Sequence, residues 1–279
     1  MTTEGAKIEQ GIAKGAVWFC AGLTVAILVL IVAFVFWQGL PYLRPSFFYE
    51  GPIRMGKEGG VFPFIVATAY ITVIAVLVAA PLGVGTAIYL TEYTRPSRLT
   101  AVIRFGADCL AGVPSIIFGL FGFVFFVIRL KLGWSVLSGG LTLALMVLPT
   151  VIRTSEEAIR VVPRAYRDVA FGLGSTRWQM VTRVVLPSAM PGILTGIILS
   201  IGRSVSETAA VMFTAGVSLK VPILPLQSGR TLALHFYILF REGISNTNAY
   251  KTATVLILAI LLINFTAYWL MRRFIAKLS

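Results

Sequence analysis

The sequence predicts an all-α integral membrane protein with six transmembrane helices. Of the 279 residues, 57% are hydrophobic and only 13% are charged, and the mean hydropathy is +0.88. This composition is typical of chains that cross a bilayer rather than of soluble cores. A net charge of +13 would suggest nucleic acid in a soluble protein. Here it agrees better with basic loops held against anionic lipid.

The first two spans follow from long uncharged runs. A short N-terminal segment, residues 1–16, precedes a predicted span at residues 17–40. Its uncharged part, Val17–Trp37, would be about 31 Å long as a helix, which is enough to cross a bilayer. Neither a short apolar core nor a small-residue cleavage site is evident, so we expect this span to be retained. Phe62–Leu90 is the second span, and Pro81 is expected to kink it.

Four further spans complete the prediction. In the third, the sequence Gly112-Val113-Pro114-Ser115 is expected to break or bend the helix. Pro114 and Ser115 then either serve packing or line a path through the membrane. A ten-residue apolar run, Thr231–Phe240, is too short to span, and we expect it to be re-entrant or interfacial. The four spans are Cys109–Ile128, Leu132–Ile152, Pro187–Gly216 and Thr252–Met271, and a tail at 272–279 follows the last one.

Some residues that resemble chemical sites are interpreted as structural. Gly51–Lys57 matches the G-x4-G-K pattern of phosphate-binding loops, but Glu58 stands where a magnesium-binding Ser or Thr is needed. We therefore expect this chain to bind no ATP by itself. Cys20 and Cys109 lie in apolar runs without metal-ligand spacing, and His235 is the only histidine. No metal site is predicted.

The basic loop at about 153–186 is the main functional candidate. Thr154 with Glu157, and Thr176 with Gln179, have the spacing of capping boxes and predict two helix starts. The loop could lie as an amphipathic hairpin on anionic headgroups, or it could dock on a partner protein. One face of its first helix is expected to be apolar and consists of Tyr166, Val169, Ala170 and Leu173.

The spacing within this loop favours docking on a partner. Asp168-Val169-Ala170, Gly174, Val184 and Leu186-Pro187 follow the pattern EAA-x3-G-x9-I-x-LP, the cytoplasmic signature of ABC-transporter permeases. Asp168 in place of Glu and Val169 in place of Ala are mild departures.

From about Phe64 to Trp269, the chain resembles type I ABC-transporter permeases, and among them the PstA-type permeases of phosphate transport. We accordingly expect the permease domain at residues 62–271. Ser206 departs from the Gly expected at its position. The segments that carry the resemblance are Ala111–Leu120, Val162–Pro187, Pro191–Gly196 and Arg203–Ala209.

The resemblance implies a division of labour among subunits. A second, PstC-like permease would complete the channel with this chain, and homodimeric ATP-binding subunits would bind ATP and Mg²⁺. An extracytoplasmic phosphate-binding protein would deliver phosphate. This chain would then be a permease subunit without a cofactor or an enzymatic activity of its own. The residues expected to couple it to the ATPase are Tyr166, Arg167, Asp168, Ala170, Phe171, Gly174, Thr176, Trp178, Leu186 and Pro187.

Arg203 and Glu207 are the charged pair of the fifth span. A spacing of four residues would put them on one helical face, where an unpaired charge costs about 2.5–3.5 kcal/mol. One interpretation is a mutually neutralising pair that serves assembly. The other, which the resemblance favours, is that Arg203 binds a phosphate oxyanion in a water-filled path while Glu207 holds the arginine in place.

Basic residues also predict the orientation. Fourteen of the 24 Lys and Arg flank one set of span ends and nine the other, so both termini and the 153–186 loop are expected in the cytoplasm of a bacterial or archaeal cell. A PstC-type paralogue and a sulfate or molybdate permease are alternatives. An ion-coupled secondary transporter would need an internal repeat, which is not evident. A purely structural anchor would leave Arg203 and Glu207 unexplained.

Overall fold

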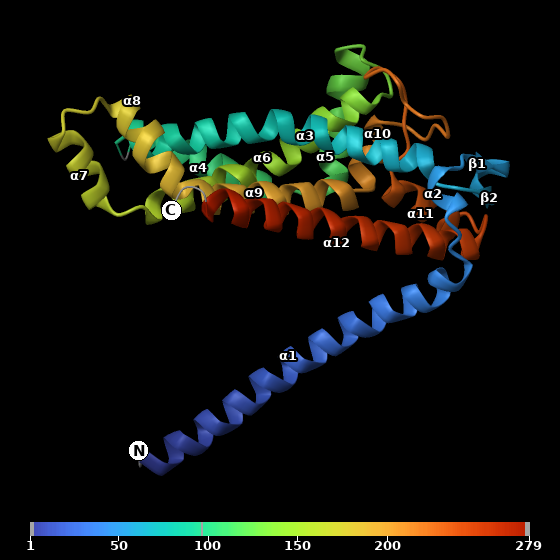
Figure 1. Cartoon of the computed structure of the whole chain (residues 1–279), viewed down its shortest axis with the longest axis horizontal. Coiled ribbons are helices and arrows are strands. Elements are labelled where there is room, and N and C mark those ends of the chain that lie inside the picture. Colours follow the sequence, from blue (N-terminus) through green and yellow to red (C-terminus); the bar gives the residue numbers. More distant parts are fainter. Residues whose placement is uncertain (1–2, 96, 277–279) are drawn as a thin grey trace.

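The structure, a computed structural model, is almost entirely helical and confirms the predicted all-α membrane fold. It describes residues 3–95 and 97–276, with side chains for residues 10–95 and 97–273. Within these ranges, five helices are long and apolar enough to cross a membrane, or six if one bent pair counts as a single span. The four that lie side by side in Figure 1 are α3 (Phe62–Ile88), α6 (Val136–Val161), α9 (Leu186–Ser206) and α12 (Asn246–Ala276).

Shorter elements gather at the two ends of this bundle (Figure 1). At one end are α7 (Arg164–Gly172) and α8 (Arg177–Met180), and at the other are α2, α11 and a small hairpin. The remaining elements are α1 (Thr3–Gly39), η1 (Leu40–Tyr42), α2 (Ser46–Tyr49), β1 (Pro52–Ile53), η2 (Arg54–Gly56), β2 (Glu58–Gly59), η3 (Tyr89–Tyr93), α4 (Arg98–Ala111), α5 (Ser115–Gly122), η4 (Phe123–Arg129), η5 (Val181–Val185), α10 (Ala209–Thr214) and α11 (Leu232–Arg241).

Helix α1 diverges from the bundle and meets it only near its C-terminal end (Figure 1). None of its apolar span is buried by the rest of the chain. At the junction, Phe34 packs edge-on against Tyr250 with ring centroids 5.9 Å apart. A Cβ at Gly39 would lie 2.6 Å from the Tyr250 carbonyl oxygen, so only glycine permits this close approach to α12.

Small residues bring the long helices together. A Cβ at Gly140 of α6 would lie 2.6 Å from the Ile74 Cβ of α3, and a Cβ at Gly192 of α9 would lie 2.5 Å from the Ala158 Cβ of α6. Gly196 approaches Thr154 of α6 more closely still. Gly192 and Gly196 form a GxxxG pattern that packs α9 against α6.

The third predicted span begins later than expected. The proline does break the helix: α4 and α5 are joined by Gly112–Pro114 with a bend of 103°. However, Cys109 lies in α4, not in the span, which starts at Ser115. The amphipathic helix α4 was missed because its capping box pairs Ser97 with Thr100 rather than with the Glu or Gln that usually marks this motif.

The fourth predicted span is longer than expected, and one of the two predicted helix starts is wrong. Helix α6 continues to Val161, and Thr154 lies inside it, with its hydroxyl donating to the Thr150 carbonyl at 2.8 Å. This back-bond is the alternative that Ser and Thr find within a helix. The other predicted start is confirmed. The Thr176 hydroxyl accepts from the Gln179 N–H at 3.3 Å, and the Gln179 side chain accepts from the Thr176 N–H at 2.9 Å.

Residues 51–59 form a docked hairpin rather than a nucleotide-binding loop. The Asn248 side-chain amide donates to the carbonyls of Gly56 at 3.1 Å and Lys57 at 2.9 Å. Beneath the hairpin, α11 buries His235, which stacks on Phe64. Burial and the nearby charge of Arg230 lower the pKa of His235 from 6.5 to about 3, so this imidazole is neutral and structural, as expected.

Packing at Gly196 gives a direct test of the fold. Gly196→Val should force α9 away from Thr154, and we expect a loss of about 1–3 kcal/mol of stability or more, measured as a lower thermal unfolding midpoint in detergent. Gly202→Val is the matched control, because the nearest atom to a Cβ there is the Asn264 side-chain oxygen at 3.8 Å. Equal midpoints for the two variants would contradict the packing described here.

Candidate functional site

Glu207 and Arg203 do not share a helical face, contrary to expectation. Helix α9 ends at Ser206, and Glu207 has extended backbone angles (φ −73°, ψ 133°). The Glu207 carboxylate instead accepts from the backbone N–H groups of Thr208 at 3.2 Å and Ala210 at 3.4 Å, at the start of α10. Within the described residues, no ion pair joins it to Arg203, whose side chain is exposed in the last turn of α9. The predicted fifth span is therefore two helices, α9 and α10, separated by a break.

A second helix break lies beside the first. Helix α5 packs on α10 so closely that a Cβ at Gly119 would be 2.9 Å from the Ala210 Cα, and one at Gly122 would be 2.9 Å from Thr214 Cγ2. The two helices thus run in the same direction. Ser115 is the first residue of α5, and Glu207 stands two residues before the first residue of α10, so a helix break precedes each of the two packed helices.

The arrangement suits an anion. Pro114 precedes α5, whose N-terminus has no side-chain cap, so its free N–H groups and helix dipole favour negative charge. Arg203 lies one turn before the break in α9. Pro114, Ser115 and Glu207 thus all stand at the starts of the two packed helices α5 and α10. Broken helices of this kind are how membrane transporters expose backbone groups to a solute.

The 153–186 loop has a helix–glycine–helix form. Between α7 and α8, Gly174 has φ +78°, a conformation that costs L-residues strain. Its N–H donates to the Phe171 carbonyl at 2.9 Å, and no atom lies within 4 Å of where its Cβ would be. A side chain at Gly174 would thus strain the backbone without a steric clash. Leu186 and Pro187 open α9, directly after the π-helical turn η5.

The apolar side of α7 is divided between core and solvent. Ala170 is buried among residues of η5 and the ends of α3 and α6. Tyr166, Val169 and Leu173 are instead exposed, Leu173 to 81%, and Trp178 of α8 is exposed to 65%. The expectation of one common stripe is therefore wrong for Ala170. An exposed apolar surface remains at the tip of the loop, outside the spans.

Arg167 ties this loop to the bundle. Its guanidinium pairs with Glu92 in η3 at 2.7 Å, and the two side chains are only 17% and 6% exposed. It also donates to the carbonyls of Val162 at 2.7 Å and Ile159 at 3.0 Å, at the end of α6. Arg167, which was expected to contact an ATPase, is thus a structural link between α7, η3 and the end of α6. Sequence analysis did not identify Glu92, because its partner is 75 positions away.

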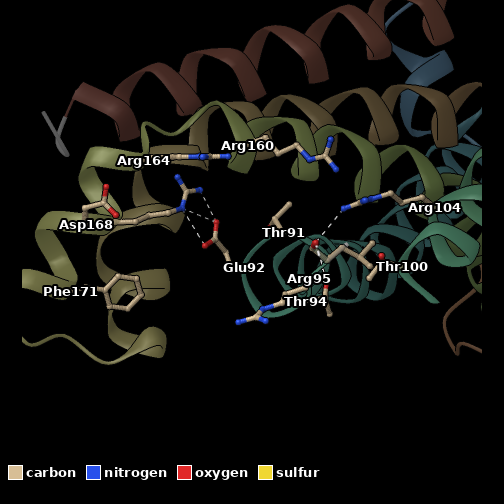
Figure 2. A pocket seen from close by; sticks show the side chains of 12 residues that line it. Thr91, Glu92, Thr94, Arg95, Thr100, Arg104, Arg160, Arg164, Asp168 and Phe171 are labelled. Carbon is tan, nitrogen blue, oxygen red and sulfur yellow. Dashed lines mark hydrogen bonds and ion pairs between the residues drawn. The ribbon is translucent and has the colours of Figure 1, made fainter. Parts of the chain in front are cut away.

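A second carboxylate links α4 to α6. Glu156 accepts from Arg104 Nε at 2.8 Å and also pairs with Arg160. Between this group and the Glu92–Arg167 pair lies a cavity of about 640 Å³, lined by η3, the start of α4, the end of α6 and α7. Figure 2 shows Arg160 and Arg164 on one side of this space and Thr94 and Arg95 on the other, with Asp168 and Phe171 toward the α7 end.

Fold and site together define the subunit of a membrane transport system. The family model described as "Binding-protein-dependent transport system inner membrane component" matches residues 79–279. The chain belongs to this family of type I ABC permeases. It is 32% identical to the "Probable ABC transporter permease protein YqgI" of Bacillus subtilis, across 98% of both chains.

Phosphate permeases are similar over a shorter stretch. The chain is 37% identical to the "Phosphate transport system permease protein PstA" of Pasteurella multocida over 180 residues, which are 64% of this chain and 63% of that relative. Identity to PstA 1 of Mycobacterium tuberculosis is 42% over 160 residues, which are 57% of this chain and 52% of the relative.

Solved permeases share the fold. A bacterial alginate ABC transporter matches with a TM-score of 0.67 and 16% identity, over 95% of this chain and 97% of that one. The MetNI methionine ABC transporter matches with a TM-score of 0.60 and 19% identity, over 77% and 94%. At such identities the likeness concerns the fold alone.

The link through Arg167 can be tested against an exposed pair. Glu92→Gln should leave a buried guanidinium without its counter-charge, a loss of about 3–5 kcal/mol for a buried pair. We expect α7 to detach locally and trypsin to cut the 164–177 segment faster. Glu157→Gln is the control, because Glu157 and Arg153 are both 67% exposed, and such pairs contribute about 0–1 kcal/mol. Unchanged proteolysis of the Glu92 variant would rule out the anchoring role.

Proposed function

We propose that this chain is the membrane-spanning permease subunit of an ATP-driven importer of inorganic phosphate. The observation that carries the proposal is the placement of Arg203 one turn before a helix break, in a chain that is 37–42% identical to PstA proteins over 160–180 residues. Guanidinium groups bind phosphate oxygens in bidentate fashion, and an uncapped helix N-terminus adds further N–H donors.

At this site, Arg203 would attract the oxyanion, and the start of α5 at Ser115 would contribute backbone donors. Glu207 already accepts from two backbone N–H groups. It would therefore hold the start of α10 in place and prevent the same N–H groups from trapping phosphate too tightly. Pro114 would keep the α4–α5 break open, because proline cannot continue the hydrogen-bond ladder of a helix.

The exposed apolar tip of the 153–186 loop would dock on an ATP-binding subunit. Aromatic and aliphatic side chains at 52–81% exposure are unfavourable in water and typical of interaction sites. The Arg167–Glu92 link would then transmit movement of the tip to α3 and α6. In this assembly, a homodimer of ATP-binding subunits binds ATP and Mg²⁺, a PstC-like permease completes the path, and an extracytoplasmic phosphate-binding protein delivers phosphate.

The orientation proposed for this subunit puts both termini and the 153–186 loop in the cytoplasm, with the chain in the plasma membrane of a bacterium or archaeon. The start of α1 and the end of α12 both lie toward the end of the bundle that carries α7 and α8 (Figure 1). This placement supports a common side of the membrane for both ends of the chain and the loop. The second candidate function is a permease for another oxyanion, such as sulfate or molybdate. It is favoured by the full-length similarity to YqgI, whose name specifies no substrate.

Arg203→Gln tests the substrate site. We expect it to abolish phosphate uptake into cells or vesicles, because an exposed guanidinium at the break is replaced by a neutral group that cannot attract the anion. Assembly with the partner subunits and ATP binding should remain near normal. The measurement is radiolabelled phosphate uptake alongside purification of the intact complex.

Two comparisons sharpen this test. Arg272→Gln removes another exposed arginine from the far end of α12 and should leave uptake within about twofold of wild type, as expected for a surface charge. Sulfate and molybdate uptake by the wild-type complex separates the second candidate function from the first. A complex with Arg203→Gln that assembles and still transports phosphate would show that Arg203 is structural.

Gly174→Val tests coupling. A β-branched residue at φ +78° is strained by about 1–3 kcal/mol, so we expect α7 and α8 to change their relative orientation. Phosphate uptake and transport-stimulated ATP hydrolysis should then collapse while the subunit stays in the membrane. Gly172→Val is the control, because Gly172 lies in α7 with helical angles and open space around its Cβ. Intact coupling in the Gly174 variant would remove the docking role.

A further inference from the structure

The cavity between α7 and the η3–α4 corner is strongly basic, and neither the substrate path nor the docking tip uses it. Its lining includes five arginines and only two carboxylates, those of Glu92 and Asp168. A third carboxylate, Glu156, neutralises Arg104 and Arg160 from within α6. The five arginines are Arg95, Arg104, Arg160, Arg164 and Arg167.

The charges of this pocket do not balance. Three carboxylates face five guanidiniums, which leaves two positive charges in excess. Arg95 and Arg164 have no ion-pair partner in the described part of the chain. Because these guanidiniums line one pocket and carry an excess of positive charge, a bound anion would be attracted to it.

The faces of α7 keep this pocket separate from the proposed ATPase contact. Arg164, Arg167, Asp168 and Phe171 follow the three- and four-residue spacing of one helical face and line the cavity. Tyr166, Val169 and Leu173 lie on another face and are exposed. One short helix thus presents apolar groups outward and arginines toward η3 and α4.

We propose that this pocket binds a phosphate group, either inorganic phosphate or the headgroup of an acidic phospholipid. A phosphate monoester carries about −1.5 to −2 charges at neutral pH, close to the excess of two, and its oxygens accept the bidentate guanidinium bonds that Arg95 and Arg164 leave unused. Helix α7 also begins at Arg164 without a side-chain cap, so its dipole adds to the attraction. A cavity of about 640 Å³ has room for a headgroup with its ester as well as for the bare ion.

Bound phosphate would bridge α7 to α4 and the end of α6, in addition to the Arg167–Glu92 link. The site would therefore respond to the presence of the anion or the lipid at the end of the bundle opposite the hairpin. When occupied, it would hold α7 in its docked position. It does not depend on phosphate being the transported ion, because its residues are distinct from Arg203, Ser115 and Glu207.

The test uses the full complex purified in nanodiscs, with hydrogen–deuterium exchange of α7, η3 and α4 as the readout. In one arm, inorganic phosphate is titrated into nanodiscs of phosphatidylcholine. In the other, nanodiscs contain phosphatidic acid and no free phosphate. We expect α7, η3 and α4 to be protected from exchange in at least one of the two arms. The arm that shows protection tells whether the bound phosphate group comes from inorganic phosphate or from the lipid. The double variant Arg95→Gln/Arg164→Gln should weaken binding about tenfold or more, as expected for the loss of charged hydrogen bonds.

Arg183→Gln is the matched control, since Arg183 is an exposed arginine of η5 that does not line the cavity. It should bind as the wild type does. Protection should also persist with Arg203→Gln, which separates this pocket from the substrate path. Absence of protection in both arms would overturn the proposal. Protection that requires the ATP-binding subunits but neither phosphate source would also overturn the proposal, because the pocket would then be a contact between proteins.

Discussion

The ion pair between Arg167 and Glu92 is the constraint on which the functional end of this molecule depends. A buried carboxylate, 6% exposed, is tolerable only with a well-placed counter-charge, and Arg167 supplies it while also donating to two carbonyls at the end of α6. Helix α7 is only nine residues long, too short to be stable alone. Its position therefore follows from this anchor and from the burial of Ala170, and both fix which face it exposes.

The 153–186 loop can be both ordered and exposed. Gly174 turns the chain at φ +78°, and the Thr176 capping box starts α8 directly afterwards, so local bonds order the turn between α7 and α8. The apolar side chains of Tyr166, Val169, Leu173 and Trp178 are exposed in the part of the chain that the structure describes. A flexible loop would fold such groups back onto the bundle. The loop thus combines an anchor, the Arg167–Glu92 pair, with exposed apolar side chains at its tip. A contact that transmits movement between subunits needs both features.

Whether a feature of the fold or of the candidate site could be predicted from the sequence depended on how far apart its interacting residues lie in the chain. Local sequence patterns predicted the all-α class, the Pro114 break and the Thr176 cap, because each depends on neighbouring residues. The back-bonded Thr154 misled the prediction, since a hydroxyl with capping-box spacing can equally bond to the preceding turn. Glu92, Glu156 and Arg104 were not recognised as linkers. Their partners are 52 to 75 positions away, and no spacing rule reaches so far.

The break at Glu207 shows where the helical-periodicity rule fails. Continuous apolar sequence from Pro187 to Gly216 favoured one helix, and within it Arg203 and Glu207 would have neutralised each other. In the structure, the carboxylate bonds to the backbone of α10 instead, and this capping competes with helix continuation. The consequence is an arginine in the last turn of α9 that has no ion-pair partner in the described residues. Because a charge in a membrane span is costly, a membrane protein retains one such as Arg203 only where an anion or water reaches it. The helix break at Glu207, which the helical periodicity did not predict, therefore supports a substrate path.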